Sequence, residues 1–326
     1  MTIILVTVLA GFALTLFLGH VLLPVLRALK AGQTIREDGP TWHASKSGTP
    51  TMGGIFFIGG SLVGLVLGLQ GVLAGDYSAL YVFLLSLCFA FIGFLDDYFK
   101  VKYKRNLGLT AIRKALLQMA VSAIYLYILY KDGLMTSDLY IPFFNVSITL
   151  HPLVYIFFSM FIMVGCVNSV NITDGVDGLA TSVTLPVMVF FTLCAFVMER
   201  FTLALFPAAL VGGLAAFLVY NFHPAKVFMG DTGSMFLGGA VCATAFALDM
   251  PLTLALVGII YVIETMSDII QMLYFKATHG KRIFKMAPIH HHFELCGWKE
   301  EKIVFVFTGI TVVMCLLAWW GIAGKF

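Results

Sequence analysis

The chain has 326 residues, of which 60% are hydrophobic and only 11% are Asp, Glu, Lys or Arg, and its net charge is +3. An ordinary soluble domain is about 25% charged, and a soluble fold of this composition would leave large apolar areas in water. The composition therefore argues against a soluble enzyme, a disordered chain and a nucleic-acid-binding module, and it favours a protein embedded in a lipid bilayer.

Ten apolar runs are long enough to cross a bilayer. In chain order they cover approximately residues 3–26, 52–73, 79–99, 115–130, 150–170, 179–198, 201–220, 234–250, 251–275 and 303–323. The runs are continuous rather than alternating, which favours helices over a closed β-barrel. We therefore expect an all-α, polytopic integral membrane protein, a single transmembrane domain over residues 1–326. The first run is too long for a cleavable signal peptide and is expected to be a retained span.

The basic residues are divided unequally between the two sets of loops. Seventeen of the 20 Lys and Arg residues lie in the odd-numbered loops, and only Lys131, Arg200 and Lys325 lie on the other side. Because cytoplasmic loops carry the excess of Lys and Arg, we expect the odd-numbered loops in the cytoplasm and both termini outside. The polar motifs lie on the same side, so any chemistry should take place at the cytoplasmic membrane surface.

Two adjacent carboxylates, Asp96 and Asp97, end the third run. Ionisable groups at this depth are costly and are usually functional. Neighbouring residues of a helix point about 100° apart, so one carboxylate could bind a metal while the other takes a proton. The alternative is a helix end that Lys100 and Lys102 hold at the interface.

The fifth run leads into a polar loop in which Asn171, Asp174 and Asp177 recur at a spacing of three. Gly175 and Gly178 would allow a tight turn and a close approach of the backbone to a ligand. The loop is not an EF-hand, because the Glu at the twelfth position is missing. The alternative is an ordinary Asx-rich turn.

Two further loops carry candidate site residues. Asp231 precedes Thr-Gly-Ser at the start of the eighth run, where the free N–H groups of a helix N-terminus could bind a phosphate; alternatively, Asp231 or Thr232 only caps the helix. Three consecutive His, His290 to His292, lack the spacing of a zinc helix. In an extended segment, His290 and His292 would share one side and could donate to a phosphate or sugar; the alternative is a solvated loop.

Polar residues also stand near the first loop and inside the ninth run. Lys46, near a Gly-rich segment, is a plausible phosphate partner, although the P-loop pattern is absent. Glu264 and Asp268 lie four residues apart on one helix face, and Gln271 follows. This stripe cannot face lipid cheaply, so it should face the bundle or a wet cleft, in a functional or a purely structural role. Taken together, the carboxylates favour Mg²⁺ or Mn²⁺ over zinc, and the basic residues suit a phosphorylated substrate.

Five motifs in a fixed order carry a family resemblance: residues 49–54 (TPTMGG), 94–100 (FLDDYFK), 171–179 (NITDGVDGL), 228–234 (FMGDTGS) and 288–294 (PIHHHFE). Together they resemble the phospho-N-acetylmuramoyl-pentapeptide transferases, which belong to the polyprenyl-phosphate N-acetylhexosamine-1-phosphate transferases. The resemblance implies that the chain transfers phospho-MurNAc-pentapeptide from UDP-MurNAc-pentapeptide to undecaprenyl phosphate, giving lipid I and UMP. It also implies Mg²⁺ as cofactor, a role in peptidoglycan synthesis, and a place in the bacterial plasma membrane.

The resemblance also implies roles for individual residues. Asp231 resembles the Mg²⁺ ligand, and Asp96 resembles the base that deprotonates or orients the lipid phosphate, with Asp97 as the competitor. The catalytic set implied by the resemblance is Asp96, Asp97, Asp231 and His290. The nucleoside-binding loop implied by it is Asn171, Asp174, Gly175, Val176 and Asp177, with Lys46 and Phe228 near the uracil. The remaining substrate-binding residues are Lys100, Lys114 (with Arg113 as the competitor), Asn221, Gln271, His291 and His292.

Several alternatives stay open at this level. A sibling transferase would use UDP-N-acetylglucosamine instead, a secondary transporter would relay ions through Glu264 and Asp268, and an interaction scaffold would perform no chemistry. The transfer could proceed by direct attack of the lipid phosphate or through a covalent phospho-Asp. The oligomeric state, including a homodimer, and the third residue of the substrate peptide are not determined by the sequence.

Overall fold

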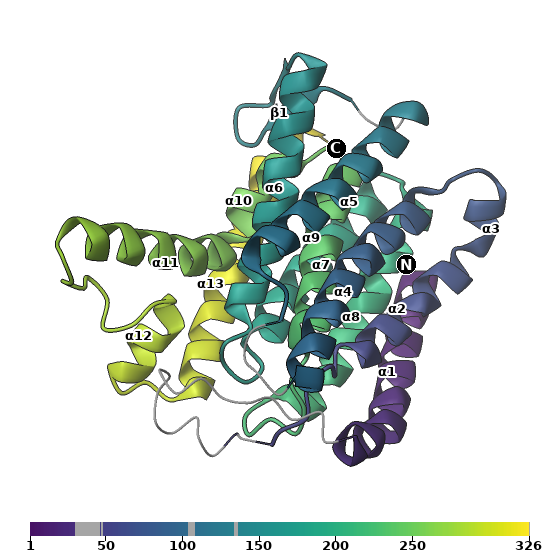
Figure 1. The fold of residues 1–326 in the computed structure, drawn as a ribbon. Helices are drawn as coiled ribbons and strands as arrows, with labels where there is room; N and C mark the ends of the chain where they lie inside the picture. The colour runs from purple at the N-terminus through teal and green to yellow at the C-terminus, as the bar shows by residue number, and fades with distance from the viewer. Residues whose placement is uncertain (30–45, 47, 104–107, 134–135, 326) are drawn as a thin grey trace.

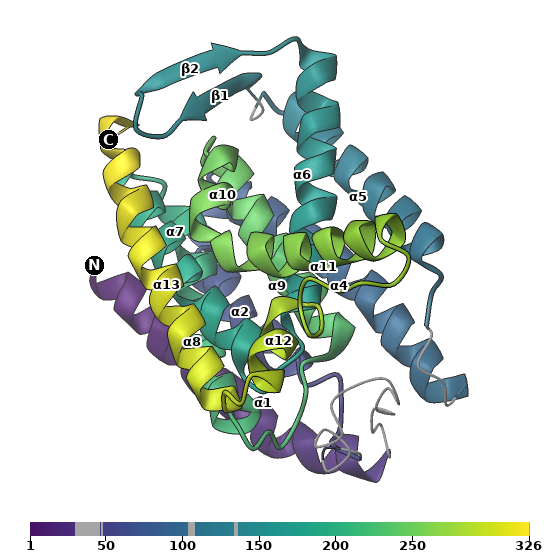
Figure 2. The same ribbon diagram turned by 90° about the vertical axis from the view of Figure 1, so that its left-hand side faces the viewer.

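The computed structural model describes residues 1–29, 46, 48–103, 108–133 and 136–325. Figures 1 and 2 show a bundle of helices with one short hairpin. The first half contains α1 (Thr2–Ala28), α2 (Ile55–Leu67), α3 (Leu69–Leu73), α4 (Ser78–Tyr103), α5 (Ala111–Lys131), β1 (Asp138–Ile141) and β2 (Val146–Thr149). The second half contains α6 (Pro152–Thr173), α7 (Leu179–Val197), α8 (Phe201–Asn221), α9 (Gly230–Ala247), η2 (Pro251–Thr253), α10 (Leu254–Val257), α11 (Ile259–Ala277), α12 (Ile289–Leu295), α13 (Glu300–Gly321) and η3 (Ala323–Lys325).

Seven of these helices have the length and composition to cross a bilayer: α1, α4, α5, α6, α7, α8 and α13. An eighth span results if Pro251–Val257 and α11, which are bent by 79° relative to each other, are counted as one. The helical, multi-span character predicted from the sequence is therefore confirmed. The count of ten and the position of the termini relative to the membrane stay predictions, because α2 has only 13 residues and α9 has 18 and does not reach the same apolarity.

The ninth apolar run is not one straight helix. Gly258 separates α10 from α11, and a Cβ built on Gly258 would lie 2.6 Å from the Leu254 carbonyl oxygen. Glycine weakens a helix because it adds no side-chain packing and costs backbone entropy, so the chain bends here. As a result α11 leaves the bundle at a steep angle and lies above α12 in the view of Figure 1.

The segment between α5 and α6, expected to be a loop, contains an antiparallel hairpin. Asp138 stands opposite Thr149 and Ile141 opposite Val146. The turn is tight: Phe143 and Asn145 both have positive φ. These strands are too short for their alternation to stand out in the sequence against the long helical runs.

Helix α9 lies in the core of the bundle, against α4 and α6. Its small residues let neighbouring backbones approach closely, as is common in membrane bundles. A Cβ on Gly238 would lie 2.6 Å from the Cα of Val167 in α6, and a Cβ on Gly239 would lie 2.9 Å from the Cα of Ser86 in α4. This close packing brings the first turn of α9 to the level of the polar ends of α4 and α6.

The bundle has two chemically different ends. At one end, Lys325 donates to the Asp249 carbonyl oxygen, and the Phe143 N–H donates to the Gly321 carbonyl oxygen. Met1 and Phe201 line one pocket at this end. Figure 1 shows the hairpin and the C-terminus together at this end and α12 toward the other. The carboxylates of the predicted site all lie at the end where α4 finishes and α9 begins.

Candidate active site

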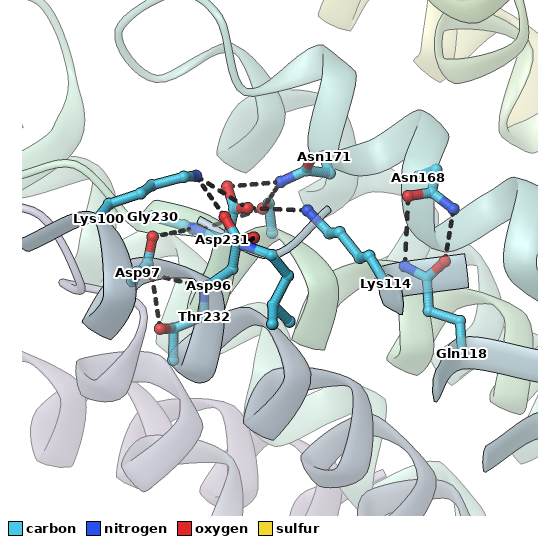
Figure 3. Close-up of polar contacts among 12 residues, drawn as sticks. Asp96, Asp97, Lys100, Lys114, Gln118, Asn168, Asn171, Gly230, Asp231 and Thr232 are labelled. Atoms are coloured by element: carbon cyan, nitrogen blue, oxygen red, sulfur yellow. Dashed lines mark hydrogen bonds and ion pairs between the residues drawn. The ribbon is translucent and has the colours of Figure 1, made fainter. Parts of the chain in front are cut away.

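The Asp231 carboxylate is the point where side chains from three other helices meet (Figure 3). Its Oδ2 atom accepts hydrogen bonds from Lys100 Nζ of α4 at 3.1 Å and from Lys114 Nζ of α5 at 2.8 Å. Its Oδ1 atom accepts one from Asn171 Nδ2 of α6 at 3.0 Å. The structure thus brings together four predicted site residues that are widely separated in the sequence. Lys114, and not its competitor Arg113, reaches the cluster.

Asp97 anchors the N-terminus of α9. Its carboxylate accepts hydrogen bonds from the Asp231 N–H at 3.1 Å, from the Thr232 N–H at 2.9 Å and from Thr232 Oγ1 at 2.7 Å. The first N–H groups of a helix have no partner within the helix and attract negative charge. Those of Asp231 and Thr232 therefore bind a carboxylate of α4, and neither a capping side chain of α9 itself nor a free phosphate is needed to satisfy them.

Asp96 faces a different direction from Asp97, as neighbouring residues of a helix do. One of its carboxylate oxygens pairs with Lys100 Nζ at 2.6 Å, and the other accepts from the Leu109 N–H at 2.7 Å. The Asp96 carboxylate also lies in hydrogen-bonding contact with that of Asp231. Two carboxylates in contact need a shared proton or a cation between them, so Asp96, unlike Asp97, is the member of the pair whose carboxylate lies beside that of Asp231.

Glycines make this close arrangement of α4 and α9 possible. A Cβ on Gly93 of α4 would lie 2.1 Å from the Asp231 carbonyl oxygen. Gly230 has a φ of +71°, and a Cβ on it would lie 2.6 Å from Asp97 Oδ2. Since a positive φ and such an approach both favour glycine, the Gly-Asp-Thr sequence of this motif has a local structural reason.

The motif at 49–54 contacts the segment that leads into α9, next to the site. Its backbone pairs with the segment before α9: Phe228 N–H donates to Pro50, Gly53 N–H to Phe228, and Gly54 N–H to Met229, at 2.9, 2.8 and 3.1 Å. This pairing holds the start of α9 in place. The sequence suggested only that these glycines allow a close approach to a ligand.

The charges of the cluster do not balance. Among the residues that the structure describes, the carboxylates of Asp96, Asp97 and Asp231 lie beside two ammonium groups, those of Lys100 and Lys114. Burial would raise the pKa of Asp231, but the Lys114 and Lys100 ammonium groups outweigh it and hold that pKa well below its usual range. Burial, together with the neighbouring Asp231, Asp97 and Asp177, raises the pKa of Asp174 well above its usual range. The oxygen donors and the excess of negative charge fit a divalent cation such as Mg²⁺.

A second cluster joins three loops around Asp177. Lys46 Nζ lies 2.8 Å from Asp177 Oδ1 and 2.6 Å from Glu300 Oε2. His223 Nδ1 and the Ala225 N–H approach the other Asp177 oxygen at 3.1 and 3.0 Å. The Lys46–Asp177 contact joins two residues that the sequence placed in the nucleoside-binding region.

Glu300 and His223 are the residues that sequence reasoning missed. Their only signals were an acidic first turn of the last helix and a His next to Pro224. Within the described part of the chain, Asp177, His223 and Glu300 form one group of three whose ligand atoms lie within 4.8 Å of one another, as a metal site requires. This group differs from the predicted ligand Asp231, and Lys46 already supplies it with a positive charge.

The His run is helical, so the extended segment in which His290 and His292 would share one side does not form. In α12 the three rings point in different directions because consecutive helical residues are about 100° apart. His290 is buried and its Nδ1 lies 2.9 Å from Glu264 Oε2 of α11. His291 pairs with Glu294 at 2.6 Å, and His292 accepts from the Lys285 N–H at 3.1 Å.

Some predicted residues lie apart from Asp231. Asn221 is buried, accepts from Thr181 Oγ1 at 2.8 Å and donates to the Val227 carbonyl at 3.1 Å, so its amide ties α8 to α7 and the following loop. Gln271 binds the backbone of Phe284 and lines a cavity of about 410 Å³ between α11 and residues 282–287. Two predicted members of the nucleoside-binding region differ in exposure: Val176 is buried, and Phe228, in the loop between α8 and α9, is half-buried.

Comparison with known proteins gives a consistent result over nearly the whole chain. A family model described as glycosyl transferase family 4 matches residues 79–249, and signature 1 of the phospho-N-acetylmuramoyl-pentapeptide-transferases matches residues 46–58. A protein of Clostridium acetobutylicum is 48% identical over 98% of both chains, and one of Clostridium perfringens strain 13 is 48% identical over 97% of both. One of Clostridium botulinum strain Alaska E43 is 46% identical over 96% of this chain and 95% of its own. All three carry the name phospho-N-acetylmuramoyl-pentapeptide-transferase.

Proposed function

This chain belongs to the phospho-N-acetylmuramoyl-pentapeptide-transferase family, and from that premise we infer that it transfers phospho-MurNAc-pentapeptide from UDP-MurNAc-pentapeptide to undecaprenyl phosphate. The products are UMP and lipid I, and the pathway is peptidoglycan synthesis. The observation that supports this best is the convergence of Lys100, Lys114 and Asn171 on Asp231, beside Asp96, at one end of an apolar bundle. A site of this kind suits two anionic substrates, one soluble and one held in the bilayer.

We propose Mg²⁺ as the cofactor, with Asp231 as its protein ligand. The contact between the Asp96 and Asp231 carboxylates and the excess of negative charge around them support this assignment. A bound divalent cation would neutralise the diphosphate of the UDP-sugar and polarise the bond that breaks. Lys100 and Lys114, which pair with Asp231, would contribute positive charge to the same phosphates.

We propose that the lipid phosphate attacks directly. An oxygen of that phosphate forms a bond with the β-phosphorus of the UDP-sugar, the bond from this phosphorus to the bridging oxygen breaks, and UMP leaves with the electron pair. Asp96 is the better candidate to receive or orient the proton of the lipid phosphate, because the Asp97 carboxylate is bound by α9. Incubation with UDP-MurNAc-pentapeptide alone should therefore leave the protein unphosphorylated; a phospho-Asp detected by mass spectrometry would refute direct attack.

We propose that the site faces the cytoplasm. The unequal distribution of Lys and Arg favours this orientation, and the soluble UDP-sugar is then on the accessible side. The end of the bundle opposite the site contains the hairpin and the three remaining basic residues, Lys131, Arg200 and Lys325. The oligomeric state, including a homodimer, is a separate question for measurement in detergent.

The assay that tests the function is the release of UMP by the detergent-purified protein. With UDP-MurNAc-pentapeptide, undecaprenyl phosphate and Mg²⁺ we expect UMP and lipid I; without the polyprenyl phosphate or after chelation of the metal we expect neither. UDP-N-acetylglucosamine serves as the matched alternative substrate. Faster turnover with UDP-N-acetylglucosamine would favour the sibling transferase, and no polyprenyl-dependent UMP release with either substrate would overturn the enzymatic function.

A further inference from the structure

Glu264 and His290 form a buried pair beneath the loop that follows α6. Their side chains are 0% and 1% exposed, and His290 Nδ1 lies 2.9 Å from Glu264 Oε2. Each also has one buried atom without a hydrogen-bond partner among the described residues, Glu264 Oε1 and His290 Nε2. Leaving a buried polar atom without a partner is unfavourable, so each such atom in a folded protein calls for an explanation.

The unpartnered His290 nitrogen points at the predicted nucleoside-binding loop. A Cβ built on Gly175 would lie 2.2 Å from His290 Nε2, so only a glycine lets the ring approach the loop backbone this closely. Asp174 and Val176 flank that glycine, and Asn171 of the same motif binds Asp231. His290 Nε2 is therefore aimed at the segment that joins the two clusters of the site.

The position of Glu264 follows from the bend of α11. The break at Gly258 turns α11 by 79°, and Glu264 then comes within reach of α12. Thr265, the next residue, donates from its hydroxyl to Ser169 Oγ at 2.8 Å, which fixes this part of α11 on the last turns of α6. The bend, the Thr265 contact and the buried pair together hold the His290 ring in one orientation.

We propose that Glu264 is a positioning residue for His290: its carboxylate accepts the Nδ1 hydrogen, so that Nε2 is the atom presented to the 174–177 loop and to the UDP-sugar bound against it. The hydrogen bond made by one ring nitrogen of a His determines the role of the other. The inference rests on the proposed function, since it deepens the account of the same site. Glu264 itself touches no substrate in this account.

Three variants separate the positioning role from a structural one. Glu264→Met removes the acceptor at similar volume, Glu264→Gln keeps an oxygen acceptor without charge, and Glu264→Asp keeps the charge but withdraws it by one methylene. Loss of the orienting partner of a functional His typically costs about 10–100-fold. We expect Glu264→Met to lower kcat for UMP release about 100-fold with little change in KM for undecaprenyl phosphate. Glu301→Met, on the first turn of α13, is the matched control and should keep wild-type kcat.

The tautomer of His290 gives a readout that needs no turnover. With ¹⁵N-labelled His, and His290→Asn to identify the signal, the wild type should show the hydrogen on Nδ1, and Glu264→Met should show it moved to Nε2. Across the three variants, kcat should follow the fraction with hydrogen on Nδ1. A variant that keeps this tautomer but loses kcat, or loses the tautomer but keeps kcat, overturns the proposal. If Glu264→Met does not fold, the Glu264→Gln and Glu264→Asp variants test the proposal, because their kcat values should follow the fraction of His290 that carries its hydrogen on Nδ1. A wild type without UMP release would instead refute the proposed function, whatever the tautomer.

Discussion

Asp231→Asn should lower the rate of UMP release by about 1000-fold or more, the largest effect we expect from any single substitution. The change is nearly isosteric, so the helix keeps its shape. It removes the negative charge on which Lys100, Lys114 and Asn171 converge, and it removes the proposed ligand of the divalent cation. The measurement is steady-state turnover in detergent over a range of Mg²⁺ concentrations.

Asp249→Asn is the matched control for this experiment. Asp249 follows the other end of α9, has a φ of +52° that Asn also tolerates, and belongs to the end of the bundle with the hairpin. We expect it to retain turnover within about twofold, because the whole length of α9 separates it from the site, and the Coulomb interaction weakens with distance. Mg²⁺-dependent turnover of Asp231→Asn near the wild-type rate would contradict the ligand assignment, and equal losses in both variants would show that the site is not localised at Asp231.

Asp97→Ala should destabilise the fold much more than Asp96→Ala. Without the Asp97 carboxylate, the N–H groups of Asp231 and Thr232 and the Thr232 hydroxyl lose their common acceptor in a buried place. Each buried donor left without an acceptor costs about 1–3 kcal/mol, so the free energy of unfolding should fall by about 3 kcal/mol or more. Turnover should fall as well, since the first turn of α9 carries Asp231.

Asp96→Ala supplies the comparison on the adjacent residue. Only the Leu109 N–H loses its acceptor, and Lys100 keeps its contact with Asp231, so a loss of about 1 kcal/mol is expected. Turnover should nevertheless fall to near background if Asp96 is the group that receives or orients the proton. The unfolding of both variants can be followed by intrinsic fluorescence in the same detergent. Equal loss of stability in the two variants would show that Asp97 is not the anchor of α9.

Much of the site was predictable as a set of residues but not as a set of contacts. The motifs around Asp96, Asp174 and Asp231 stand out because carboxylates next to apolar runs are rare and costly. Which partner each carboxylate meets was not predictable: Asp97 binds the start of a helix more than 130 positions away along the chain. Glu300 had no distinguishing local signal, because acidic residues at a helix start are common. The polar helix face that carries Glu264 was recognisable, but it did not show that His290 would be the partner.

Two local structures that the sequence left open share a physical cause. The sequence allowed an extended segment at the His run, but Pro288 stands at the N-cap of a short helix that packs against α11. No proline stands at the bend of the ninth run to predict it. Gly258 alone does not break a helix unless neighbouring elements favour the break. Such local choices are decided by packing that short-range sequence patterns do not contain.

The sequence by itself determined that this is a helical protein for an apolar solvent, approximately where its long apolar helices lie, and, through five ordered motifs, to which family it belongs. These properties follow from composition and from periodicity within single segments, and both can be counted along the chain. The tertiary structure alone decided that Asp97 holds α9 while Asp96 and Lys114 meet Asp231, and that Glu264 holds His290. Contacts of this kind depend on how closely the helices pack and where they bend. The spacing of residues along the chain does not indicate which distant side chains then face one another.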